Sequence, residues 1–375
     1  MHPAKLHPLL RGAREPSAVV HFSADDWNRC LRAARTERVL ARLGYRIADA
    51  GALGRCPAAA RDQLIAARAY PGFLQCRIAH EVSQVRRALP AADGDLILLK
   101  GAAYHCAGLP LTRGRQLRDL DILVPRTRID AFERDLLAAG WESQPLDEYD
   151  QRYYRDWMHE IPPLRHPQRG VEVDLHHRLL PLTSRLRPDP DLLWESALPV
   201  AGMPGVRVLS PVDMLLHTAT HLFHDGAIRG GLNDLWDIDE LLRHFAAQPA
   251  FWETLPERAA RLDLGRPLYY GLLFSRALLG TPIPAAVLTE VGRRFAPARP
   301  VNALMHTLVT RALPPQEGRS ALTGLANWLL YVRSHWLRMP PHLLLPHLIR
   351  KSLRRLGGLD QHSGRRVDKR DSLRT

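Results

Sequence analysis

Long apolar runs are missing from this chain. No stretch approaches the roughly 20 apolar residues that a membrane-spanning helix needs, and Met1 to Leu10 lacks the apolar centre of a secretory signal. These absences argue against a membrane-spanning or secreted protein. We therefore expect a globular, cytoplasmic protein.

Cysteine is also scarce. The four cysteines, Cys30, Cys56, Cys76 and Cys106, show neither CxxC spacing nor a paired pattern. The sequence therefore predicts free, mostly buried thiols, and it suggests neither disulfides nor a cysteine zinc site.

Lysine is equally rare, with only Lys5, Lys100, Lys351 and Lys369 among 52 basic residues. Arginine dominance beside many Ala, Leu and Pro residues is typical of a GC-rich genome. The net charge of +13 and the pI near 10.1 are therefore weak evidence for a polyanionic partner. Lys100 is the one lysine outside the end segments, and its compact ammonium would suit phosphate chemistry.

With 375 residues, 46% of them hydrophobic, the chain is long enough for two or three structural units. Its patterns predict an α+β protein with four parts: an N-terminal helical region (1–94), a core of short strands (95–180), a C-terminal helical region (181–312), and an amphipathic segment with a basic, partly disordered tail (313–375).

Several helix boundaries are indicated by local signals. Ser23 and its following acids predict a helix start, and one long helix is expected over 58–87. Thr127 is expected to cap a helix that reaches Ala139, with Gly140 in the left-handed conformation. Residues 148–156 are predicted to be a mobile connection. Further helices are expected from 210 and over 232–245, 251–262, 267–279 and 321–337.

The central segment carries acids on a predicted strand. The apolar run 96–99 leads into Lys100, Gly101 and a short helix over 102–107, and residues 117–124 then alternate like a strand. Side chains of a strand alternate between its faces, so Asp119 and Asp121 lie on one side. Two carboxylates this close favour a bound cation.

A second acidic strand follows. Residues 158–164 and 171–177 flank a turn at 166–170 and read as a hairpin, with Glu172, Asp174 and His176 on one face. If this strand lies beside the first, Asp174 completes a cluster of three carboxylates. Such a cluster suits phosphoryl or nucleotidyl transfer at two hard cations.

The turn at Lys100 and Gly101 leads into a helix start, where backbone N–H groups favour a triphosphate and Lys100 adds positive charge. Arg115 and Arg118 flank the acids, and either could neutralise phosphate oxygens or balance the carboxylates.

Together the Lys-Gly turn, the segment RQLRDLDILV (115–124) and the segment VEVDLH (171–176) resemble the DNA polymerase β-like nucleotidyltransferase superfamily. More narrowly, they are similar to an uncharacterised bacterial nucleotidyltransferase family with an Arg four residues before DxD and a third acidic strand reading Asp-x-His. The resemblance covers about residues 80–245, and it implies a small mixed-sheet nucleotidyltransferase core flanked by helical regions.

By that resemblance, Asp119 and Asp121 bind two Mg²⁺ ions, with Mn²⁺ as a substitute, and Asp174 holds one ion and helps to deprotonate the acceptor. Nucleotide-binding roles are expected for Lys100, Gly101, Ala102, Arg115 and Arg118. Ala102 departs from the superfamily, which usually has a second Gly or a Ser there. Accessory roles are expected for Glu172, His176, His221, His224 and Asp237.

Asp213, His217, His221 and His224 recur along one face of the helix that starts at 210. The histidines span two turns, so one metal ion is unlikely to meet all three. We favour a polar stripe against the core, with His221 or His224 bonded to Asp234 or Asp237, over a metal site or contacts with the nucleotide or acceptor.

The helix expected over 321–337 carries Leu325, Trp328, Val332 and Trp336 at helical spacing. Core packing is favoured, and peripheral contact with a membrane or RNA through the basic C-terminus is the alternative. Tyr149, Tyr153, Tyr154 and Trp157 either stack on a base or belong to a loop that covers the cleft.

Three functions follow for testing. The first is transfer of a nucleoside monophosphate from an NTP, with ATP as the first guess, to a small molecule, peptide or RNA. The second is a catalytically silent nucleotidyltransferase-like module that binds RNA or a protein partner. The third is a metal-dependent phosphohydrolase that uses the same acids.

Overall fold

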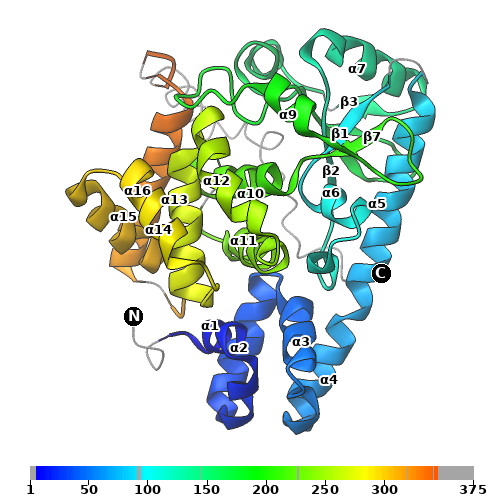
Figure 1. Cartoon of the computed structure of the whole chain (residues 1–375). Coiled ribbons are helices and arrows are strands. Elements are labelled where there is room, and N and C mark those ends of the chain that lie inside the picture. Colours follow the sequence, from blue (N-terminus) through cyan, green and yellow to red (C-terminus); the bar gives the residue numbers. More distant parts are fainter. Residues whose placement is uncertain are drawn as a thin grey trace.

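A computed structural model describes residues 6–90, 94–143, 145–225, 228–318, 320–340 and 342–344. It has one mixed sheet surrounded by many helices (Figure 1). The α+β class with helical flanks is confirmed. The predicted disorder of the basic tail falls on residues outside the described ones.

The sheet has the strand order β3-β4-β5-β2-β1-β7-β6. Its strands are β1 (Leu96–Leu98), β2 (Asp119–Leu123), β3 (Glu142–Ser143), β4 (Leu164–Arg165), β5 (Glu172–His176), β6 (Leu198–Pro199) and β7 (Val206–Val208). The central pair, β2 and β5, is parallel, while β4 pairs antiparallel with β5. The predicted hairpin is confirmed around its turn, but its first strand is only Leu164–Arg165 and not 158–164. The two acidic strands are neighbours.

In the described part of the chain, five α-helices precede the sheet: α1 (Pro8–Arg14), α2 (Ala24–Thr36), α3 (Leu40–Asp49), α4 (Ala58–Ala67) and α5 (Ala69–Ala88). Ser23 caps α2 in a capping box with Asp26, as predicted. The expected single helix over 58–87 is wrong, since the chain breaks between α4 and α5. Pro71 explains this break, because it cannot donate the hydrogen bond that would link it to the last turn of α4.

The sheet region contains α6 (Lys100–Cys106), α7 (Ile129–Ala138), α8 (Glu148–Arg152) and α9 (Pro190–Ser196). Gly140 has a φ of 95°, as expected after α7. The cap at Thr127 is wrong, because residues 126–128 already form a 3-10 turn and α7 begins after Arg128 without a side-chain cap.

The segment expected to be a mobile connection is helical instead. A π-helical turn, Tyr153–Trp157, continues α8. Its rings pack edge to face, with centroids 6.1 Å apart for Tyr149 and Trp157 and 5.9 Å apart for Tyr153 and Trp157. Arg155 also contacts Glu133 at 3.0 Å. These contacts explain the helix, which a polar and aromatic composition does not reveal.

The C-terminal helices are α10 (Pro211–Thr220), α11 (Leu232–Phe245), α12 (Pro249–Arg261), α13 (Gly265–Phe274), α14 (Ala285–Phe295), α15 (Arg299–Ala312) and α16 (Ala321–Arg338). Ser210 caps α10 as predicted. α10 is central, because it packs against α11, α12 and α13 on one side and against α6 beside the sheet on the other. The C-terminal helices therefore cover α6, which lies beside the acidic strand β2.

The preference for core packing of α16 is wrong for most of its apolar side chains. Leu325, Trp328, Val332 and Trp336 are exposed, with 58% of Trp328 accessible. α16 packs mainly on α15 and on the turn after α10, so only a narrow face around Ala326 and Leu330 is buried. Among the described residues, no helix combines the length and apolarity needed to cross a bilayer.

Buried ion pairs join the N-terminal helices to α11. Arg42 of α3 contacts Asp237 at 2.7 Å and Glu240 at 2.6 Å, and Arg46 contacts Asp239 at 2.7 Å.

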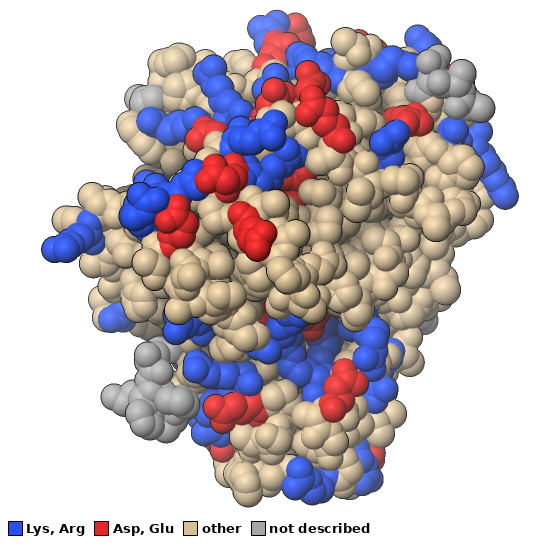
Figure 2. Space-filling view, in the orientation of Figure 1, with Lys and Arg blue, Asp and Glu red and all other residues tan. Residues whose placement is uncertain are grey.

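On the face in Figure 2, basic and acidic side chains lie beside one another across the upper part, next to a broad uncharged area. Many of the basic side chains on this face therefore have acidic neighbours.

Candidate functional site

Two neighbouring parallel strands bring the predicted carboxylates together. In the register of β2 and β5, Asp119 lies opposite Glu172 and Asp121 lies opposite Asp174. Residues two apart on a strand share a face, so these four acids form two adjacent rows on one side of the sheet. Alternation predicted which acids share a face of each strand, and the pairing of the two strands supplies the condition under which they converge.

Lys100 and His176 meet the same oxygen of this cluster. Lys100 Nζ lies 2.9 Å from Asp121 Oδ1, and His176 Nε2 lies 3.1 Å from that oxygen. Lys100 adopts a φ of 46°, which is unusual for a residue with a side chain. The strained turn aims its ammonium at the carboxylates, which fits the clustering of such conformations at functional sites.

The electrostatics of the acids diverge. Burial would raise the pKa of Asp121, but Lys100 and His176 hold it well below the usual range. Burial and the nearby Asp121 charge raise the pKa of Asp174 well above the usual range, and burial together with Asp119 raises that of Glu172. The pKa of Asp119 is also raised, by desolvation from its surroundings and by Asp121, although Asp119 itself is solvent accessible. The cluster therefore holds more negative charge than Lys100 balances.

His159 and Glu160 are site residues that the sequence analysis missed. A bridge pairs Glu160 with His176 across the sheet edge, and His176 Nδ1 lies 3.5 Å from Glu160 Oε2. His159 is buried, and its Nε2 lies 3.9 Å from the same oxygen. The adjacent His-Glu pair in the first predicted strand of the hairpin was the available signal, but only the isolated bridge shows that it faces His176.

Arg115 and Gly101 lie against each other, whereas both were expected to bind the nucleotide. The Arg115 guanidinium is buried and donates to both carboxylate oxygens of Asp237, with contacts of 2.9 Å to Oδ2 from Nε and Nη2. A Cβ at Gly101 would lie 2.0 Å from Arg115 Nη1. Gly101 is thus required by the close approach of Arg115, and Asp237 holds that guanidinium in place.

The other expected nucleotide-binding residues lie near the cluster in different settings. Ala102 is buried in α6, so its methyl group belongs to the core. Arg118 is half-buried and donates to Gln116 at 3.0 Å. Burial and the nearby Arg38 lower the Arg118 pKa. The Ala102 methyl group packs in the core and the Arg118 guanidinium bonds to Gln116, so neither side chain joins the carboxylate rows.

The polar face of α10 makes separate contacts. Asp213 pairs with Arg258 at 2.7 Å, His221 lies 3.4 Å from Asp234, and Ser184 lies 2.8 Å from His224. His217 is buried, and burial together with the Lys100 charge keeps its pKa well below the usual range. These contacts agree with a polar stripe, which is the alternative favoured from the sequence. They include the predicted contact between His221 and Asp234.

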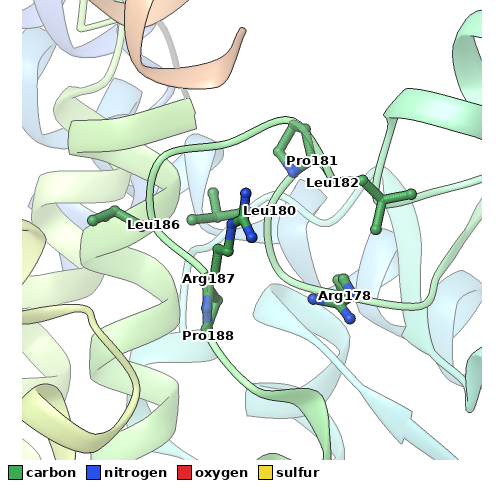
Figure 3. Close-up of a pocket in the computed structure, with 7 residues that line it drawn as sticks. All are labelled: Arg178, Leu180, Pro181, Leu182, Leu186, Arg187 and Pro188. Atoms are coloured by element: carbon green, nitrogen blue, oxygen red, sulfur yellow. The ribbon is translucent and has the colours of Figure 1, made fainter. Parts of the chain in front are cut away.

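A separate cavity of about 200 Å³ lies in the loop between β5 and α9 (Figure 3). It is lined by Arg178, Leu180, Pro181, Leu182, Leu186, Arg187 and Pro188. None of these residues belongs to the carboxylate cluster, so we do not assign the cavity to the same chemistry.

The donor set fits hard divalent cations. Asp119, Asp121, Asp174 and Glu172 offer carboxylate ligands, which Mg²⁺ prefers. The raised pKa values of Asp119, Asp174 and Glu172 reflect uncompensated negative charge. Among the described residues, a second donor group contains nitrogen: ligand atoms of His159, Glu160 and His176 lie within 4.8 Å of one another.

The four cysteines are free, as predicted, but only Cys30 and Cys56 are buried. Cys76 is exposed and Cys106 is partly buried, so the expectation of mostly buried thiols holds for half of them.

Comparison with known proteins supplies the family. No curated protein and no solved structure matched this chain. The family described as "Uncharacterised nucleotidyltransferase" matches residues 23–280, which is more than half of the 375-residue chain and includes every acid of the cluster. The chain therefore belongs to this uncharacterised nucleotidyltransferase family.

Proposed function

We propose that the chain transfers a nucleoside monophosphate from an NTP to a hydroxyl or phosphate acceptor, with release of pyrophosphate. The observation that carries the proposal is the register of β2 and β5, which sets Asp121 beside Asp174 and Asp119 beside Glu172. The family match supports NTP transfer in general. We also propose that the chain belongs to the DNA polymerase β-like superfamily, that it uses two Mg²⁺ ions and that ATP is the donor.

The proposed cation site consists of Asp119, Asp121 and Asp174. Two Mg²⁺ ions, when bound, would supply positive charge opposite the attacking and leaving oxygens. Lys100 shares that role from the protein side, since its ammonium contacts Asp121 and is only partly buried. Mn²⁺ has similar oxygen preferences and is the expected substitute.

In the proposed reaction, an acceptor oxygen forms a bond to the α-phosphorus of the NTP, and the bond from that phosphorus to the pyrophosphate oxygen breaks. Asp174 is the proposed acceptor of that proton, as the superfamily resemblance implies, and the strand register sets it directly beside Asp121. The negative charge leaves on pyrophosphate, and Lys100 lies where it can offset that charge.

Arg115 has a different proposed role from direct phosphate binding. Its guanidinium is committed to Asp237, and it packs over Gly101. We propose that Asp237 positions Arg115 and thereby fixes the Lys100 turn from behind. His221 and His224 remain accessory candidates, and Arg118 remains a candidate for nucleotide binding.

The test uses the purified full chain with Mg²⁺, a fractionated lysate and each NTP labelled at either the α- or the γ-phosphate. Transfer predicts α-label in a new adduct and γ-label in pyrophosphate. Release of γ-label as inorganic phosphate would instead identify a phosphohydrolase. Salt-sensitive RNA binding without turnover of either label would identify the silent module.

A matched variant assigns any activity to this site. Asp119→Asn should abolish α-label transfer while the far-UV circular dichroism spectrum stays unchanged. Glu142→Gln, an exposed acid on strand β3 of the same sheet, serves as the control and should transfer label like the wild type.

A further inference from the structure

Beside the carboxylate rows, His159, Glu160 and His176 form a compact group of two imidazoles and one carboxylate. Their ligand atoms lie within 4.8 Å of one another. Atoms bound to a single tetrahedral Zn²⁺ are about 3.3 Å apart, given metal–ligand distances of about 2.0–2.2 Å. The contacts of Glu160 Oε2 with His176 Nδ1 at 3.5 Å and with His159 Nε2 at 3.9 Å are already close to that spacing.

The backbone holds this group together. The isolated bridge sets Glu160 opposite His176, and His177 N donates to His159 O at 2.8 Å. Ile161 N also donates to Leu175 O at 3.0 Å. The three ligands therefore come from two chain segments that are fixed in register, so small side-chain movements suffice to close the group around an ion.

The outer contact of His176 is the kind that metal-bound histidines make. Its Nε2 lies 3.1 Å from Asp121 Oδ1, a carboxylate oxygen that can only accept. With an ion bound at Nδ1, on the side of Glu160, Nε2 would keep its hydrogen and donate it to Asp121. A carboxylate that holds one ring nitrogen of a histidine while the other nitrogen binds metal is a recurrent arrangement.

We propose that His159, Glu160 and His176 bind one divalent transition-metal ion of the Zn²⁺ or Co²⁺ class. Two imidazole ligands favour such ions over Mg²⁺, which selects oxygen. Its three ligands differ from the proposed Mg²⁺ ligands Asp119, Asp121 and Asp174, and the two sites meet where His176 contacts Asp121. Access is through Glu160, whose side chain is 24% exposed, because both histidines are buried.

The ion would have a positioning role. It would tie the segment that precedes the hairpin to the end of β5 and fix the His176 ring that bonds to Asp121. The inference does not require nucleotidyl transfer, since metal binding is measured directly on the protein.

The experiment titrates Co²⁺ and Zn²⁺ into the metal-free, tag-free full chain in the presence of excess Mg²⁺. We expect one Co²⁺ per chain, visible d–d absorption that saturates at that ratio, and displacement by one Zn²⁺. We also expect NMR signals from two histidine rings shifted by the bound Co²⁺, a readout that needs no variant. No saturable absorption, or shifted signals from fewer than two histidines, would overturn the proposal.

Variants locate the ion. His159→Gln and Glu160→Gln should each weaken Zn²⁺ binding by more than about 100-fold, because even loss of an outer partner costs about 10- to 100-fold. His80→Gln, which removes an exposed histidine of α5, and Asp119→Asn should bind like the wild type. If Asp119→Asn loses the ion while His159→Gln retains it, the ion belongs to the carboxylate rows and the proposal is wrong. Absence of α-label transfer in a protein that binds Co²⁺ in this way would count against the proposed reaction only.

Discussion

Asp237 of α11 connects three parts of the chain, and its substitution by Asn is the most informative test of the packing around the site. Asp237 contacts Arg42 of α3 at 2.7 Å and Arg115 beside the acidic strand at 2.9 Å. The side chains of Arg42 and Asp237 are 0% and 2% exposed. Asn removes the negative charge between two buried guanidiniums.

Removing one partner of a buried ion pair costs about 3–5 kcal/mol, because the remaining charge stays desolvated. Asn keeps one accepting oxygen and Arg42 keeps Glu240, so we expect the lower end, about 3 kcal/mol, for Asp237→Asn. The measurement is the free energy of unfolding from urea titration followed by circular dichroism. The double variant Arg115→Met/Asp237→Asn should lose less than the sum of the single variants, since the two residues contact each other.

The control is Asp49→Asn. It removes the negative charge from the two contacts of Asp49 with Arg113, but these side chains are 58% and 52% exposed. Exposed pairs contribute about 0–1 kcal/mol. If Asp237→Asn destabilises the protein no more than Asp49→Asn does, the reasoning about the buried network is refuted.

Three further predictions concern single residues. Gly101→Ala should lower the unfolding free energy by about 1–3 kcal/mol in urea, because its methyl group would overlap the Arg115 guanidinium that Asp237 holds; a neutral effect would contradict this. Burial raises the pKa of Glu37, and its buried Oε2 has no hydrogen-bond partner among the described residues. Native Glu37 therefore retains its proton to higher pH, and the free energy of unfolding falls as pH rises through that interval. Glu37→Gln should therefore stabilise the protein by on the order of 1 kcal/mol at pH 7 and by much less at pH 4, and equal gains at both pH values would rule this out. Burial raises the Cys106 pKa to about 11, so at pH 8 its alkylation, followed by mass spectrometry, should be roughly 200-fold slower than that of an ordinary exposed thiol, whereas exposed Cys76 should react first.

Features that depend on local chemistry were predictable from the sequence. Ser23 and Ser210 cap their helices through side-chain oxygens, and alternation along two strands placed Asp119, Asp121 and Asp174 on shared faces. The turn at Lys100 was recognisable because Lys100 is the one lysine outside the end segments and follows a buried strand. In each case the signal lies within a few residues of the feature.

Features that depend on distant partners were not predictable. The sequence left Arg115 open to phosphate or to the neighbouring carboxylates, whereas its partner Asp237 lies 122 residues further along the chain. His159 and Glu160 became site residues only through their pairing with β5. The exposed face of α16 was taken for core because helical spacing of apolar residues does not reveal how many neighbours a helix has.

The central claim is that carboxylates from two parallel strands work together in nucleotidyl transfer, and Asp174→Asn tests it most directly. Burial and like charge raise the pKa of Asp174, so the neutral amide should leave the unfolding temperature unchanged or higher. The measurement is the rate of α-label transfer with Mg²⁺, compared with the wild type. We predict a loss of about 1000-fold or more, since such ligands contribute several kcal/mol to the transition state. Wild-type transfer by a folded Asp174→Asn protein would contradict the account.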